Sequence, residues 1–173
     1  LTLTKNFECI YKKASSRLRL LDKLSIYLNT EAVSKVFNMM IVPIITYSGT
    51  VKLDFNKTQS NKFKSIECRA KLLTNNAEVI SIEGLLKKQS CVIVRQCLDK
   101  NTCSNFSDYF KLQKHRISTR NNNVMIKLPK VNLEVGRQSF HYQGAKKYNE
   151  LPLVIRKEEN FSKFKELLKN HFT

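Results

Sequence analysis

The chain has 173 residues, of which 42% are hydrophobic, a length that suits one domain, or one core with an appended piece. Its 31 Lys and Arg against 14 Asp and Glu give a formal net charge of +17. Self-repulsion at that charge disfavours a compact monomer, so we expect a polyanionic partner. Nucleic acid is favoured because the basic residues are spread along the chain. The alternative is a basic protein whose charge has no specific partner.

The most apolar stretch runs from Val36 to Ile45 and is interrupted by Pro43. It is about half as long as a bilayer-spanning helix, so it predicts a buried core helix and no membrane partner. The five cysteines stand at unrelated spacings, which does not resemble a disulfide framework. We therefore expect a reducing, intracellular location, in the cytoplasm or the nucleus.

The first predicted helix has one apolar face and one basic face. Apolar residues recur at helical spacing at Phe7, Tyr11, Ala14, Leu18, Leu21 and Leu28. Basic residues fall about half a turn away, at Lys5, Lys12, Arg19 and Lys23. The segment then stops at Asn29, and Thr30 is the expected cap of the next helix.

The second helix should form a hairpin with the first and should kink or end at Pro43. Its inward residues are Val33, Val36, Phe37, Met40, Ile41 and Ile44. After a loop to Asn56, a third helix is predicted with Phe63, Ile66, Ala70 and Leu73 on one face and Lys62, Lys64, Arg69 and Lys71 between them. Asn75-Asn76 should end it.

A fourth helix is predicted from a cap at Ser81, with Ile82, Leu85, Leu86, Ile93 and Cys97 inward. Its run Cys91–Val94 would also suit a strand, but Lys87, Lys88 and Arg95 continue a polar face and favour a helix. A short helical turn is expected near 106–112.

The composition changes between Tyr109 and Leu133, where no acidic residue occurs. The basic residues there are Lys111, Lys114, Arg116, Arg120, Lys127 and Lys130. Alternating apolar residues on either side of Pro129 predict a short β-hairpin near 124–135. A helix from about Gln143 to Glu150 follows, and then a last helix capped by Asn160, with Phe161, Phe164, Leu168 and Phe172 on one face.

These elements predict a mainly α fold, a helical bundle with one short hairpin. Residues 1–100 would form a helical region, and residues 101–173 would hold the basic loop, the hairpin and the C-terminal helices. The helical stretches before and after Asn101 would then be two subdomains.

No catalytic centre is expected. A metal-dependent polymerase or nuclease needs clustered carboxylates, and the four aspartates, Asp22, Asp54, Asp99 and Asp108, are far apart in sequence. Cys91, Cys97 and Cys103 are spaced by six, which does not match zinc-site spacing and favours buried cysteines over a metal site with Cys68 or His115. We expect no metal, no cofactor and no catalytic residue, with His141 packing or bonding locally.

Aromatic residues flank the basic segment, and they provide candidates for stacking on bases: Tyr109, Phe110, Phe140 and Tyr142. For Phe110 and Phe140 a place in the core is favoured instead. Tyr142 is open.

The order of several motifs resembles the region after the polymerase core in non-LTR, LINE-type and jockey-like, retrotransposon reverse transcriptases. The first part is carried by Lys12–Leu21, the Pro43–Tyr47 pattern, Arg69-Ala70 and Ser81–Lys88. The later part is carried by His115, Thr119-Arg120, Gly136–Phe140, Gly144–Lys146 and Asn149–Pro152. The chain departs from that family at Tyr148, where a Trp is usual.

The resemblance implies the C-terminal, thumb and post-thumb part of an RNA-directed DNA polymerase. The fingers and palm, with the paired aspartates that bind magnesium, would belong to a longer parent protein. A thumb helix needs an apolar face against its bundle and a basic face against phosphates. On that basis the candidate RNA- or DNA-binding residues are Lys12, Lys13, Arg17, Arg19, Lys23, Lys87, Lys88, Lys114, Arg116 and Arg120.

Three other interpretations concern Arg137, the C-terminal helix and the whole chain. Arg137 would pair with Glu134 or Glu150 instead of binding phosphate. The chain could be a structural or protein-interaction module, whose face from Phe161 to Phe172 docks on a partner or on the missing palm. It could also be an inert, degenerate transposon remnant.

Overall fold

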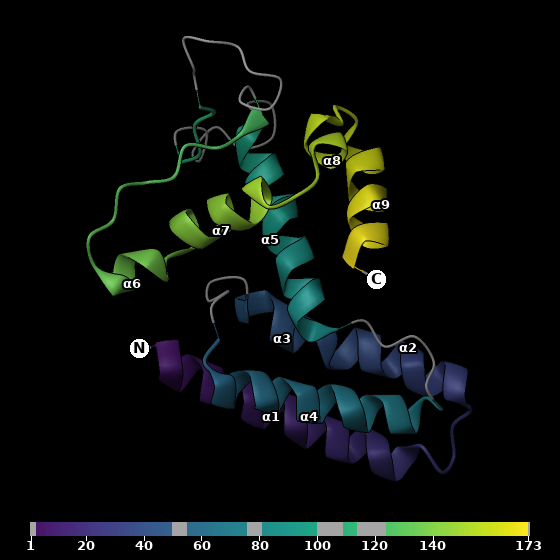
Figure 1. Ribbon diagram of the computed structural model, residues 1–173. Helices are drawn as coiled ribbons and strands as arrows, with labels where there is room; N and C mark the ends of the chain where they lie inside the picture. The colour runs from purple at the N-terminus through teal and green to yellow at the C-terminus, as the bar shows by residue number, and fades with distance from the viewer. Residues whose placement is uncertain (1–2, 50–54, 76–80, 100–108, 114–123, 173) are drawn as a thin grey trace. The chain divides into compact units, whose positions relative to one another are not determined.

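The computed structural model describes residues 3–49, 55–75, 81–99, 109–113 and 124–172 (Figure 1). These residues are mainly helical, with a single isolated β-bridge among them, and the predicted mainly α class is confirmed. The chain divides into two compact units, Leu1–Leu86 and Lys87–Thr173. The division falls inside helix α5 (Ile82–Leu98), not near residue 100, where the sequence placed it. No helix within the described ranges is both long and apolar enough to cross a bilayer.

The first unit contains α1 (Leu3–Leu24), α2 (Thr30–Met40), α3 (Val42–Gly49), α4 (Lys57–Leu73) and the start of α5. Helix α1 packs against α2, α3 and α4, so its predicted apolar face is covered on several sides. The buried side chains are those of Phe7, Ile10, Ala14, Leu18, Leu21, Val33, Phe37, Ile41, Ile45, Phe63, Ile66, Ala70, Ile82 and Leu86. Burial of these apolar surfaces is the main stabilising contribution to the unit.

The break between α2 and α3 confirms the effect expected of Pro43. Helix α2 ends at Met40 and α3 begins at Val42, so Pro43 lies in the first turn of α3, where its missing N–H costs no hydrogen bond. The predicted cap, Thr30, is wrong by one residue. The Ala32 N–H donates to Asn29 Oδ1 at 2.8 Å, and Asn29 has the extended backbone that an N-cap requires.

The end of α4 is set locally, whereas the start of α5 depends on a side chain from another helix. Asn75 has a positive φ of 49°, a conformation that Asn tolerates better than most residues, and α4 ends there as expected. Helix α5 begins directly after Ser81, as predicted, but the capping oxygen comes from another helix. The Ile82 N–H donates to the carboxylate of Glu67 from α4 at 2.5 Å, and the Ser81 hydroxyl also donates to Glu67.

The second unit contains the rest of α5 with α6 (Glu134–Arg137), α7 (Phe140–Asn149), α8 (Leu153–Lys157) and α9 (Phe161–Phe172). The run Cys91–Val94 lies inside α5, so the helical prediction is confirmed there. One cluster forms the core: Cys91, Val94, Cys97, Phe110, Ile126, Ala145, Tyr148, Leu151, Ile155, Phe164 and Leu168.

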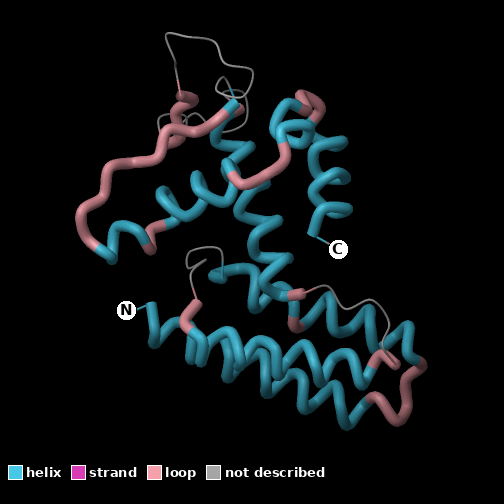
Figure 2. The backbone as a smooth tube through the Cα atoms, in the orientation of Figure 1, coloured by secondary structure: helices cyan, strands magenta, loops and turns pink. Residues whose placement is uncertain are grey.

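The predicted hairpin near 124–135 is wrong. Ile126 forms an antiparallel bridge with Leu112 instead, flanked by the hydrogen bonds Gln113 N–H to Met125 O (2.7 Å) and Lys127 N–H to Lys111 O (2.8 Å). Residues 127–133 then run as a loop into α6 (Figure 2). The helical turn expected near 106–112 is also wrong for Lys111 and Leu112, which are extended, while 106–108 lie outside the described residues.

Asn149 of α7 explains why no second strand pairs with Ile126. Its side chain accepts from the Ile126 N–H at 2.8 Å and donates to the Ile126 carbonyl at 2.9 Å. The amide therefore occupies the edge that a returning strand would need. Pro129, which has no N–H, is also unsuited to a ladder.

The last helix is capped as predicted, because the N–H groups of Ser162 and Lys163 donate to Asn160 Oδ1 at 2.9 and 3.2 Å. Its apolar face, however, is not available to a partner. Phe164 and Leu168 are fully buried, and Phe161 and Phe172 pack on the same cluster. The proposed docking of this face on another protein is therefore wrong, since the second unit covers the face itself.

Candidate nucleic-acid interface

Helices α1 and α4 lie side by side and run in the same direction (Figure 1). Near their starts the rings of Phe7 and Phe63 meet with centroids 5.1 Å apart, and Lys62 Nζ lies 2.7 Å from Glu8 Oε1. Towards the ends Arg69 pairs with Asp22. Two ion pairs thus join the helices, one near their starts and one towards their ends. We call the surface formed by these two helices the α1–α4 face.

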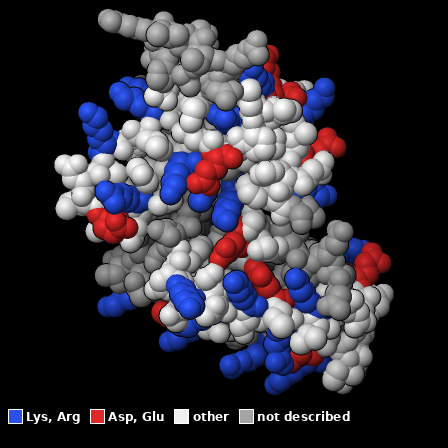
Figure 3. Space-filling view, in the orientation of Figure 1, with Lys and Arg blue, Asp and Glu red and all other residues white. Residues whose placement is uncertain are grey.

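The α1–α4 face carries a large excess of positive charge. The two helices contain eleven Lys and Arg against three Asp and Glu. Each of those carboxylates is already bonded internally: Glu8 to Lys62, Asp22 to Arg69, and Glu67 to the start of α5. Lys and Arg side chains accordingly line the edge of this unit where α1 lies (Figure 3).

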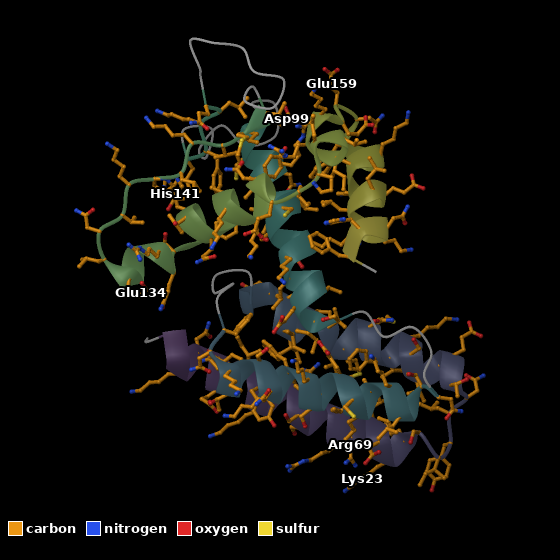
Figure 4. The ribbon with its side chains drawn as sticks, in the orientation of Figure 1. Lys23, Arg69, Asp99, Glu134, His141 and Glu159 are labelled. Atoms are coloured by element: carbon orange, nitrogen blue, oxygen red, sulfur yellow. The ribbon has the colours of Figure 1, made fainter. Side chains whose placement is uncertain are left out.

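Three of the five candidates on α1 form one stripe. Successive helical residues are rotated by about 100°, so Lys12, Arg19 and Lys23 fall within roughly 40° of one another. All three are exposed. Figure 4 shows Lys23 and Arg69 on the same side of the two helices. The stripe extends along about three turns of the helix.

The other two candidates on α1 are also exposed but lie off the stripe. Lys13 and Arg17 are rotated from Lys12 by about 100° and 140°. The Arg17 guanidinium points to the last turn of α2, where Nη1 lies 3.5 Å from the carbonyl oxygen of Met40. A cation is stabilised at a helix C-terminus, so this contact gives Arg17 a structural role.

A groove of about 360 Å³ lies between α1 and α4. Its lining residues are Tyr11, Ser15, Leu18, Arg19, Ser65, Ile66 and Arg69. Two arginines and three hydroxyl-bearing residues from the two helices thus line the groove together with the apolar Leu18 and Ile66. Arginine N–H groups and hydroxyls are the usual ligands of backbone phosphates, and Arg69 has more donors than its pairing with Asp22 uses.

Sequence reasoning missed Ser15, Ser65 and Arg69 as site residues. The basic residues of α4 were visible as a polar face, and Lys62 and Arg69 stand seven residues apart on one side of it. That this side faces α1 depends on the parallel packing of two helices separated by α2 and α3. Helical periodicity alone does not supply that information.

Lys87 and Lys88 belong to the second unit and are half-buried. Partial burial lowers the pKa of the Lys88 ammonium, and the nearby charge of Lys169 lowers it further. An anion close to Lys88 would relieve that repulsion. The remaining candidates, Lys114, Arg116 and Arg120, lie outside the described residues, as does His115.

Four cysteines and two histidines lie within the described part of the chain. Cys91 and Cys97 are buried as predicted, and burial raises the pKa of the Cys91 thiol to about 12. Cys68 is exposed and Cys103 is outside the described ranges. Within those ranges no three His, Cys, Asp or Glu side chains gather as a metal site would require. His141 packs on Tyr109 and Phe110, which confirms its predicted local role.

Several motif residues in the second unit have contacts within that unit. The Ser139 hydroxyl donates to the Gly136 carbonyl at 2.6 Å, and the Gln143 amide donates to the Arg137 carbonyl at 2.8 Å. At Gly144 a Cβ would lie 3.1 Å from a methyl group of Val94, so the absence of a side chain lets α7 approach α5. These residues build the scaffold. Arg137 itself lies 3.8 Å from Glu134, the first of the partners expected for it.

Comparison with known proteins adds no further identification. No protein-family model, no curated protein and no solved structure matches the chain. The resemblance to reverse transcriptases rests on the sequence motifs alone and is untested by these comparisons.

Proposed function

We propose that this chain is a non-catalytic nucleic-acid-binding region that holds the sugar–phosphate backbone of a duplex on its α1–α4 face. The observation that carries the proposal is the groove in which Arg19 and Arg69 converge from two helices beside Ser15 and Ser65. The motif order further suggests the C-terminal part of a retrotransposon reverse transcriptase. In that protein the polymerase chemistry and its magnesium ions would belong to the palm, and the chain would act inside the cell.

The arrangement suits backbone binding better than base reading. Lys12, Arg19 and Lys23 follow the axis of α1 over about 16 Å, a length that meets several successive phosphates. Contacts to phosphates position a duplex but carry little sequence information. The Asp22 and Glu8 carboxylates, held by Arg69 and Lys62, keep the two helices together while the stripe stays open to a ligand.

Fluorescence anisotropy of a labelled RNA–DNA hybrid, titrated at 50 to 200 mM salt, tests the proposal. Binding should weaken steeply with salt and change little with sequence. Arg19→Gln should weaken it, whereas Lys163→Gln, which removes an exposed cation from α9, should not. Salt-independent binding, or none at low salt, would contradict a backbone-binding role.

A protein-interaction module is the second candidate, and exposed apolar residues at the turn after α1 favour it. Ile26 and Tyr27 are more than four-fifths exposed, and Leu20 and Leu24 beside them are also open to solvent. Exposed apolar residues gathered within one short segment are the kind of feature that a protein contact uses. If Ile26→Ser with Tyr27→Ser abolished association with a polymerase palm supplied in trans, while the hybrid did not bind at any salt concentration, this function would replace the first.

An inert transposon remnant predicts a poorly packed chain. Each described unit instead has a buried apolar core. A cooperative thermal transition followed by near-UV circular dichroism would agree with a functional fold, and a broad transition without near-UV signal would favour the remnant.

A further inference from the structure

The second unit contains a pocket of about 270 Å³ beside the bridge between Leu112 and Ile126. Its lining residues are Tyr109, Lys111, Lys127, Leu128, Pro129, Lys130 and His141. We call it the Tyr109 pocket. It involves no residue of the α1–α4 face, and each of its lining residues lies in the described part of the chain.

One side of the pocket is aromatic. The rings of Tyr109 and His141 have centroids 4.6 Å apart, and the buried Phe110 contacts both, at 5.8 and 5.5 Å. Phe110 in turn packs edge-on against Phe140. The Tyr109 ring is therefore held from beneath by a chain of core aromatics, yet 49% of the residue remains exposed. A rigid, half-exposed aromatic ring is the feature on which a nucleobase stacks.

The rim of the pocket is basic. Lys127 and Lys130 are exposed, and neither has a carboxylate partner among the described residues. The stretch from Tyr109 to Leu133 contains no acidic residue, so the local field favours an anion. Leu128 and Pro129 supply an apolar wall between the two lysines.

The size of the pocket limits the ligand. Pockets for drug-sized molecules span about 300 to 1,000 Å³, so this one suits a single base rather than a larger group. A base in a duplex is stacked on both faces and is unavailable. The combination of one aromatic platform with cations on its rim thus matches a base from an unpaired strand, whose flanking phosphates lie outside the pocket.

We infer that the Tyr109 pocket binds one unstacked nucleobase of single-stranded RNA or DNA, with Lys127 and Lys130 on the adjoining phosphates. This adds a single-strand site to the proposed duplex-binding face. The two sites share no residue, so either one can fail without the other.

The test uses the full chain and labelled 12-nucleotide single strands of RNA and of DNA in an anisotropy titration. A strand of equal length in which abasic sites replace the bases is the matched ligand. Tyr109→Leu keeps an apolar side chain but removes the aromatic face. It should lower affinity for the base-containing strands about tenfold, with no change for the abasic strand or for a duplex.

Four further variants separate stacking and charge from damage to the fold. Tyr109→Phe should bind like the original chain. Lys127→Gln and Lys130→Gln should each reduce the salt dependence of single-strand binding by about 0.7 in the logarithmic slope, while Lys157→Gln on α8 should not. Circular dichroism of every variant checks that it folds.

Three results would overturn the inference. The first is equal binding of the abasic and base-containing strands by the original chain. The second is unchanged binding by a folded Tyr109→Leu variant. The third is displacement of the strand by an equimolar nucleoside monophosphate, which would assign the pocket to a free nucleotide. Loss of duplex binding in Arg19→Gln would leave the inference intact, because it reports on the other site.

Discussion

Tyr148 lies at the centre of the second unit and is fully buried. Its hydroxyl lies near the Arg95 guanidinium, which donates to the Glu158 carbonyl at 2.9 Å, and it has no hydrogen-bond partner of good geometry within the described structure. Burial raises the pKa of the Tyr148 hydroxyl, and the charge of Arg95 partly offsets the effect. The buried ring therefore contributes to the core, and the contribution of the hydroxyl depends on its contact with Arg95.

Substitutions at Tyr148 should separate these two contributions. Tyr148→Phe removes an unpaired buried hydroxyl and should leave the free energy of unfolding unchanged or raise it by about 1 kcal/mol. Tyr148→Ala should lower it by about 3–5 kcal/mol, because a large cavity remains. Urea unfolding measures both. A loss of more than about 1 kcal/mol in Tyr148→Phe would mean that the hydroxyl has a stabilising partner.

Cys91 should make the second unit sensitive to alkaline pH. Its pKa is about 12 in the folded chain against an ordinary 9.0, so the folded state favours the neutral thiol. The resulting stability is complete below pH 9 and is lost as the pH rises from 9 towards 12. Between pH 8 and pH 10 the original chain should therefore lose about 1.4 kcal/mol more than Cys91→Ala.

Urea unfolding at the two pH values measures this difference. The exposed Cys68 provides the control, since Cys68→Ala should show the same pH dependence as the original chain. Identical pH dependence in Cys91→Ala would show that Cys91 is not the group responsible.

At the scale of elements, Asn149 of α7 fixes the segment around Ile126. One side-chain amide replaces a neighbouring strand by bonding both backbone groups of that residue. Asn149→Ala should lower the free energy of unfolding by about 1–3 kcal/mol, because it leaves a partly buried N–H and carbonyl without partners. Asn149→Asp keeps the acceptor for the Ile126 N–H but sets a carboxylate oxygen against the Ile126 carbonyl, so it should lower the free energy of unfolding at least as much. Asn170→Ala on the exposed side of α9 should change it by almost nothing. Chemical unfolding ranks the three variants.

The same element shows how far the sequence could predict the fold. Helices with a long periodic face, such as α1 and α9, were predictable because one side of each must be apolar. The segment 124–135 was not, because its alternation fits a hairpin while its actual partners, Leu112 and Asn149, are set by tertiary packing. The start of α5 depends likewise on Glu67 from another helix. For the site, periodicity identified the stripe on α1, and only packing added Arg69 and the two serines.

At the scale of the whole molecule, the net charge of +17 destabilises the folded units unless most Lys and Arg side chains are paired or face solvent. On the α1–α4 face three carboxylates join helices together, and the remaining cations face solvent. In the second unit, described residues of the acid-free stretch line the Tyr109 pocket. Folding brings the positive charges of each unit close together, and a bound polyanion would stabilise both units by neutralising their repulsion.

The role of the α1–α4 face is tested most directly by the salt dependence of RNA–DNA hybrid binding in a triple variant, Lys12→Gln, Arg19→Gln and Lys23→Gln. Each lost phosphate contact should reduce the slope of log K against log salt by about 0.9, a total of about 2.7 relative to the original chain. A matched triple variant, Lys146→Gln, Lys157→Gln and Lys163→Gln, removes as much charge from the second unit and should keep the original slope. An equal reduction in both variants, or none in the first, would contradict a duplex-binding role for this face.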